Sequence, residues 1–215
     1  MKPMTWLAVV ATLALAVPVA AHVPYVEHAD FTGQRPFVMT GNPEQSIAVY
    51  AWLETDFVSP ADDIDVYQFE LVEEALVYAE LIVPACVGYE DYAPWYAVVG
   101  PNFPQPTQPL PFNLPEGYGA VVMENTEPGE PRTTFYEFFG NQTYYEGPVF
   151  EHVIDQPGVY YVVVWDPWEL GGDYTLALGK EEIWGLTDIL RALIVTPWIR
   201  QDRVLHVDEC VLPIE

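Results

Sequence analysis

The sequence predicts an all-β protein: an antiparallel β-sandwich followed by one amphipathic helix near the C-terminus. Between residues 46 and 179, short segments rich in β-branched and aromatic residues follow one another, which is typical of strands. Turn residues separate these segments and no helical periodicity appears among them, as in sandwiches and barrels. After residue 179 the apolar residues recur at helical spacing instead.

Residues 1–21 are expected to be an export signal. Lys2 supplies a positive charge, residues 6–17 are largely apolar, and small residues precede the expected cleavage after Ala21. The apolar stretch is shorter than the roughly 20 residues that a membrane-spanning helix needs. Cleavage would leave a secreted, periplasmic or cell-surface protein that begins at His22. Retention of the segment as an uncleaved anchor is the alternative.

The charge of the chain is strongly negative and unevenly spread. Residues 22–179, the expected sandwich domain, contain 25 acidic and two basic residues, a net charge of −23. Residues 180–215, the expected helical appendage and tail, contain seven acidic and four basic residues. Such a surface repels nucleic acid phosphates and anionic lipids, so we expect no nucleic acid partner. It favours cations, basic partners or simple solubility.

The expected strands are short, and two of them have clear patterns. In residues 65–72, Tyr67, Phe69 and Leu71 alternate with polar residues, as in a half-buried strand. Residues 159–165 form the strongest strand signal, a run of Val, Tyr and Trp. The full set of expected strands is 47–53, 65–72, 76–83, 96–99, 120–123, 159–165 and 173–178.

A proline-rich stretch interrupts the strands between residues 100 and 119. It contains six prolines, and because proline cannot donate a ladder hydrogen bond, it cannot be a central strand. Long insertions of this kind in a compact domain are usually functional loops or covers for an open sheet edge. We expect one of these two roles here.

The C-terminal helix is expected over residues 186–196. Its apolar residues recur at helical spacing, and Pro197 is expected to end it. Docking of this apolar face on the sandwich is one expectation, and contact with a membrane interface is the other. The apolar face comprises Leu186, Ile189, Leu190, Leu193 and Ile194.

Three segments together resemble a known family. Residues 63–69 read Asp-Ile-Asp-Val-Tyr-Gln-Phe, residues 157–164 contain Pro-Gly-Val-Tyr followed by a Val run, and residues 172–178 begin Gly-Asp-Tyr-Thr-Leu. Their order and spacing resemble the bacterial pre-peptidase C-terminal domain. The resemblance implies a jelly-roll-like β-sandwich that serves as a non-catalytic module of secreted or cell-surface proteins.

The chain contains two cysteines, Cys86 and Cys210. In an exported protein one disulfide is expected rather than two free thiols. Their wide separation does not match a zinc site, which needs clustered ligands. We therefore expect a disulfide that fixes the C-terminal tail to the sandwich.

No catalytic motif is present: the sequence has no nucleophile elbow, no zinc-protease helix and no phosphate-binding glycine loop. We therefore expect a non-catalytic binding or structural module. Its partner would be an unidentified protein or a surface glycan, which aromatic residues including Trp52, Trp165, Trp168 and Tyr144 could bind by stacking if they are exposed.

A calcium site is one candidate for bound metal. Asp62, Asp63 and Asp65 form an acidic turn, and calcium takes six to eight oxygen ligands. In a sandwich the strand of Asp65 could lie near that of Asp173, which would add a fourth carboxylate. An ordinary turn in which these residues cap their own backbone is the alternative.

A copper site is the other candidate. If His22 is the first residue of the exported chain, its α-amine and imidazole can chelate one copper ion together. A second histidine would complete the arrangement, and His28, His152 and His206 are available. The alternative is a flexible terminus with an incidental histidine.

Overall fold

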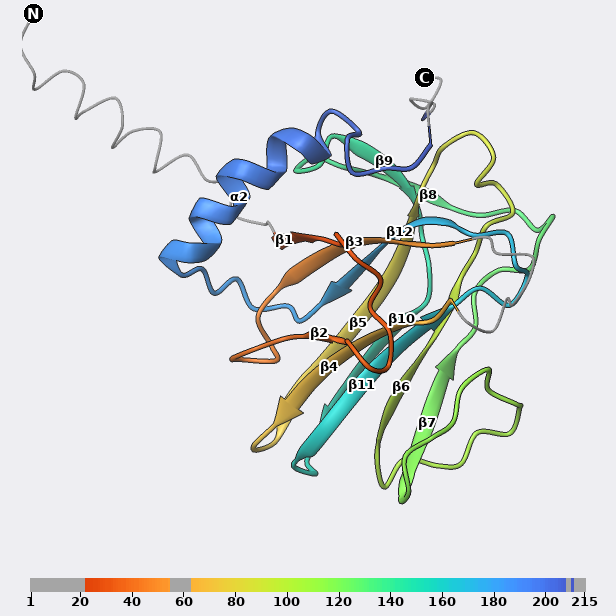
Figure 1. Cartoon of the computed structure of the whole chain (residues 1–215), viewed down its shortest axis with the longest axis vertical. Coiled ribbons are helices and arrows are strands. Elements are labelled where there is room, and N and C mark those ends of the chain that lie inside the picture. The colour runs from red at the N-terminus through yellow and green to blue at the C-terminus, as the bar shows by residue number, and fades with distance from the viewer. Residues whose placement is uncertain (1–21, 55–62, 208–209, 211–215) are drawn as a thin grey trace, which may run out of the picture.

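The computed structural model describes residues 22–54, 63–207 and 210. Within them, two β-sheets pack face to face as a sandwich, and one helix lies outside the sheets (Figure 1). Seven strands form one sheet, in the order β1-β3-β12-β5-β9-β8 with β10 also paired to β5. Five strands form the other, in the order β2-β4-β11-β6-β7. The all-β sandwich that the sequence predicts is confirmed.

The strands are short, as expected for such a sandwich. Those of the first sheet are β1 (Val23–Val26), β3 (Ile47–Leu53), β5 (Ala75–Pro84), β8 (Thr134–Glu137), β9 (Gln142–Tyr145), β10 (Val149–Ile154) and β12 (Gly172–Leu178). Those of the second are β2 (Phe37–Val38), β4 (Asp65–Leu71), β6 (Trp95–Pro101), β7 (Tyr118–Met123) and β11 (Gly158–Trp165).

The main core lies between the two sheets, and its residues follow the period of two along each strand. In β4, Tyr67, Phe69 and Leu71 are buried in this core while Glu70 faces solvent. β11 pairs with β4 on one side and with β6 on the other, so it is central in its sheet. This position explains its unbroken apolar sequence, because both of its faces are covered.

The sheets differ from the expected antiparallel arrangement at two edges. β1 pairs with β3 in parallel, and β2 pairs with β4 in parallel. β1, β2, β8, β9 and β10 were not among the expected strands. They are two to six residues long, and segments this short carry too little alternation to stand out from loops.

The proline-rich stretch covers both an edge and a face of the second sheet. Pro104 accepts a hydrogen bond from the backbone N–H of Ala120 in the edge strand β7, at 3.0 Å. The backbone carbonyl of Tyr118 in β7 accepts a second bond, from the side chain of Gln105 at 2.8 Å. The expected role as an edge cover is confirmed. Farther along the stretch, three apolar side chains pack on the outer face of the sheet: Leu110, Phe112 and Leu114.

The helix α2 (Leu186–Ile199) packs against the edge strand β1 (Figure 1). It is longer than expected, because Pro197 lies inside its last turn instead of ending it. Proline there forfeits a single backbone hydrogen bond. The three further residues bring Ile199, which is 3% exposed, against Ala48 and Tyr50 of β3. No helix among the described residues is long and apolar enough to cross a membrane.

The helix docks through the face opposite to the expected one. Arg191 stacks over the ring of Tyr25 at 4.0 Å, and the Asp188 carboxylate accepts hydrogen bonds from Gln45 and from the Gly185 backbone. These contacts fix the rotation of the helix and turn its apolar stripe outward. The expectation that the helix docks on the sandwich through its apolar stripe is therefore wrong. Its residues are exposed: Leu186 by 74%, Ile189 by 37%, Leu190 by 52%, Leu193 by 69% and Ile194 by 63%.

The C-terminal tail returns to the sandwich after α2. Cys86, which follows β5, forms a disulfide with Cys210 across 124 positions of sequence. Leu205 and Val207 pack against the main core on the way to this bond. The expected disulfide and its role in fixing the tail are confirmed, and they fit an oxidising compartment.

Two substitutions in α2 should separate its docked side from its exposed side. Ile199→Asp places a charge in a buried apolar site, so we expect a loss of about 3 kcal/mol or more in the free energy of unfolding. Leu190→Asp changes an exposed position and should alter it by less than about 0.5 kcal/mol. Urea denaturation of both variants tests this. Equal losses would contradict the observed orientation of the helix.

The disulfide should contribute about 2–4 kcal/mol to stability, because it restricts the unfolded chain. Thiol labelling of the denatured, unreduced protein should modify no cysteine, and after reduction it should modify both. Denaturation with and without reductant measures the stability difference. A thiol that reacts before reduction would contradict the bond.

Candidate metal centre

Three carboxylates converge where the two sheets meet. Glu27 follows β1, Asp65 begins β4, and Asp30 lies in the segment that leads from β1 to β2. One oxygen from each lies within 4.8 Å of the others. Glu27 and Asp65 are 3% and 0% exposed, whereas Asp30 is exposed. Three oxygens this close together could hold one metal ion, and calcium binds oxygen ligands at about 2.3–2.6 Å.

Backbone and tyrosine donors hold the two buried carboxylates in place. Glu27 accepts hydrogen bonds from the backbone N–H of Phe31 at 3.0 Å and of Trp52 at 3.2 Å. Asp65 accepts a longer bond from the same Phe31 N–H, at 3.3 Å, and a bond from the Tyr174 hydroxyl. Each carboxylate oxygen has two lone pairs, so these contacts leave capacity for a metal. Such outer donors orient metal ligands.

Asp63 adds a fourth carboxylate to this region. The pKa of Asp63 is raised to about 7, mainly by burial and also by the negative charges of Asp30 and Glu54. Burial likewise raises the pKa of Glu27 to about 7, with Asp30 and Asp63 as nearby charges. The pKa of Asp65 is raised well above its usual value, first by burial and then by Glu27.

No basic side chain among the described residues forms an ion pair with these carboxylates. The ion pairs in that part of the chain are Lys180–Glu151, Arg191–Asp188 and His206–Asp173. Arg35 donates to the backbone carbonyl of Asp30, and its charge opposes the rise that burial causes in the pKa of the Asp30 carboxyl. Burying carboxylates without a compensating charge is unfavourable. The site therefore favours either bound protons or a bound cation.

The expected calcium ligands are only partly together. Asp63 and Asp65 lie in this region, whereas Asp62 lies outside the described residues. Asp173 is not in the group, because its carboxylate is engaged elsewhere. Sequence reasoning missed Glu27 and Asp30. The available signal was two carboxylates three residues apart after a short apolar segment, but nothing local connects them with residue 65.

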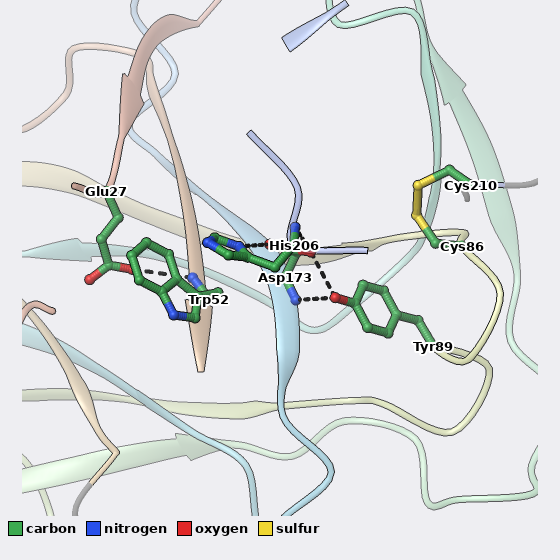
Figure 2. A network of polar contacts seen from close by, with 7 residues as sticks. All are labelled: Glu27, Trp52, Cys86, Tyr89, Asp173, His206 and Cys210. Atoms are coloured by element: carbon green, nitrogen blue, oxygen red, sulfur yellow. Dashed lines mark hydrogen bonds and ion pairs between the residues drawn. A yellow bond between two sulfur atoms is a disulfide. The ribbon is translucent and has the colours of Figure 1, made fainter. Parts of the chain in front are cut away.

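Asp173 instead fixes the C-terminal tail (Figure 2). Its buried carboxylate accepts hydrogen bonds from the Tyr89 hydroxyl at 2.7 Å and from the His206 backbone at 2.8 Å. The His206 ring contacts it through Nδ1 at 2.7 Å and packs against Trp52, with ring centroids 4.3 Å apart. Trp52 is the residue whose backbone donates to Glu27, so the tail and the acidic cluster share a neighbour.

The histidines expected to bind copper do not lie together. His22 precedes the strand and contacts the Ser46 hydroxyl through Nδ1; burial lowers the pKa of its imidazole. His28 is exposed beyond the other end of the strand, and four extended residues alone span about 13 Å. His206 is bound to Asp173, and His152 packs against Phe150. The copper site at His22 stays a prediction.

The aromatic residues considered for glycan stacking are divided between core and surface. Trp165 and Tyr144 are buried, at 7% and 2% exposed, whereas Trp168 is 39% exposed. Among the described residues, the expected aromatic side chains therefore do not form one exposed stacking surface, because Trp165 and Tyr144 are buried. A surface glycan as partner stays a prediction.

Comparison with known proteins gives a structural likeness but no sequence relative. No family model matches the chain, and no curated protein matches it. Among solved structures, the chain is similar to the pre-peptidase C-terminal domain of a collagenase from Bacillus anthracis. The two are 16% identical, the match covers 65% of this chain and 98% of that domain, and the TM-score is 0.31. This collagenase domain belongs to the same kind of domain that the three sequence segments resemble. A TM-score of 0.31 is too low to support a conclusion about the chain.

Proposed function

We propose that the chain is an exported, non-catalytic β-sandwich module that binds one calcium ion through Glu27, Asp30, Asp63 and Asp65. The observation that carries this proposal is the convergence of three carboxylate oxygens within 4.8 Å, two of them from buried side chains. No basic side chain among the described residues forms an ion pair with them. A hard divalent cation with oxygen ligands compensates this charge most directly.

The proposed ion would link the two sheets. Glu27 continues from β1 of the seven-stranded sheet, and Asp65 begins β4 of the five-stranded sheet. An ion bound to both would add a cross-link at a place where the carboxylates otherwise repel one another. Its effect on this module is therefore structural: it stabilises the end of the sandwich and fixes the segment around Asp30.

The partner of the module stays a prediction, either a protein or a surface glycan. The net charge of −23 over residues 22–179 argues against nucleic acid. The disulfide between Cys86 and Cys210 supports work in an oxidising compartment. The lack of a catalytic motif in the sequence supports a non-catalytic role.

Calcium should raise the thermal stability of the protein, because a ligand that binds only the folded state stabilises it. The expected gain is about 2.7 kcal/mol at a hundredfold excess over the dissociation constant. Asp65→Asn should abolish the gain. Glu70→Gln is the matched control, because Glu70 lies on the same strand but is exposed; it should keep the gain. Thermal melts of metal-free protein with calcium or magnesium measure both. A calcium shift no larger than that of magnesium would refute the site.

Without metal, the stability should fall as the pH rises. The pKa of Glu27 is about 7 in the folded protein and near 4.5 when unfolded, so between these values the folded state binds more protons. The free energy of unfolding contributed by this group then decreases with increasing pH. Denaturation in EDTA at pH 5 and pH 8 should therefore show a larger loss for wild type than for Glu27→Gln.

Calcium should remove most of this difference, because it stabilises the ionised carboxylates. Its stabilising effect should accordingly be larger at pH 8 than at pH 5. Identical pH dependence in wild type and Glu27→Gln would show that Glu27 does not carry the titration.

A further inference from the structure

The outward face of α2 is an apolar surface without an ionisable residue. The charged residues of the helix, Asp188 and Arg191, lie on its docked side, with side chains 15% and 36% exposed. The outward side presents large apolar side chains that a folded protein normally buries. They are Leu186, Ile189, Leu190, Leu193, Ile194 and Trp198, between 37% and 74% exposed.

A second element exposes an aromatic side chain at the C-terminal end of the same helix. Phe138, in the turn between β8 and β9, is 80% exposed. Arg200 joins this turn to the helix end, donating to the carbonyl of Phe138 at 3.1 Å and of Phe139 at 2.8 Å. Trp198, 47% exposed, lies two residues before Arg200. Exposed apolar side chains therefore occur both on the helix and on the turn that is hydrogen-bonded to its C-terminal end.

Three of the four basic residues between positions 180 and 203 are already engaged. Arg191 stacks on Tyr25, Arg200 holds the Phe138 turn, and Lys180 pairs with Glu151 at 2.9 Å. The four basic and four acidic residues between 180 and 203 also balance. The surface thus offers no basic patch for an anionic partner, and its attraction to any partner must be apolar.

The charge distribution favours a lipid surface over a second copy of the chain as the partner of this apolar face. Pairing two copies through α2 would bring together two bodies that each carry −23 over residues 22–179, and these would repel. A zwitterionic bilayer has no net charge to oppose the apolar contact.

We propose that the outward face of α2, together with Phe138, inserts into the interface of a zwitterionic lipid bilayer and holds the acidic sandwich at the membrane surface. The helix would lie in the plane of the interface, as amphipathic helices with one apolar side do. Trp198 would sit at the headgroup level, where tryptophan is enriched. This inference goes beyond calcium binding and does not depend on it.

The test is flotation of the exported, purified protein with phosphatidylcholine vesicles. Wild type should float with the vesicles, and Leu193→Glu should bind at least about tenfold more weakly, because the charge must enter the apolar layer. Val153→Glu is the matched control: Val153 is 63% exposed on β10, close to the 69% of Leu193. It should bind as wild type does. Phe138→Glu should weaken binding as well.

Four results would overturn the proposal. Wild type that does not float, or Leu193→Glu that floats equally well, would exclude insertion through this face. Tighter binding to vesicles that contain phosphatidylglycerol would show attraction by basic residues instead of apolar insertion. Analytical ultracentrifugation supplies the last check: a wild-type dimer that becomes monomeric in Leu193→Glu would assign the surface to a second copy of the chain. Circular dichroism of each variant, with the melt of wild type as reference, confirms that the variants fold.

Discussion

The stability of this sandwich depends on how the buried carboxylates of Glu27 and Asp65 are neutralised. They lie where the two sheets meet, so their charge cannot be relieved by moving one side chain into solvent without opening the junction. Protons neutralise them at low pH, and the calcium ion that we propose would do so at higher pH. In both cases the backbone N–H of Phe31 donates to Glu27 and Asp65. These bonds order the segment between β1 and β2 by attaching it to the two carboxylates that close this end of the domain.

A different solution operates at Asp173, one residue before Tyr174, which donates to Asp65. Asp173 is also buried, but the Tyr89 hydroxyl, the His206 backbone and the His206 ring surround it with donors. Donors of this kind satisfy a carboxylate without a metal. Asp173 and Asp65 are both buried, but their neighbours differ: Asp173 fixes the tail, whereas Asp65 belongs to a group of carboxylates with too few donors.

The parts of the fold that the sequence predicts are those encoded by local patterns. Tyr67, Phe69 and Leu71 alternate and form the expected strand, and the apolar run at 159–165 is a central strand. The helix was also predictable, but its rotation was not, because the contacts of Arg191 with Tyr25 and of Asp188 with Gln45 join residues more than 140 positions apart. Glu27 and Asp65 are likewise 38 positions apart, and only the packing of the sheets brings them together.

The disulfide between Cys86 and Cys210 also determines how the domain would respond to mechanical force. A pull on the chain beyond Cys210 passes through the sulfur atoms to Cys86, just after β5, a strand with partners on both sides in the first sheet. The backbone between the two cysteines, including α2, lies in a closed covalent loop, so the pull reaches β5 before it reaches the tail or the helix. Breaking the attachment would require shearing an interior strand, which is held by many hydrogen bonds at once, whereas without the disulfide the tail and helix would peel away first.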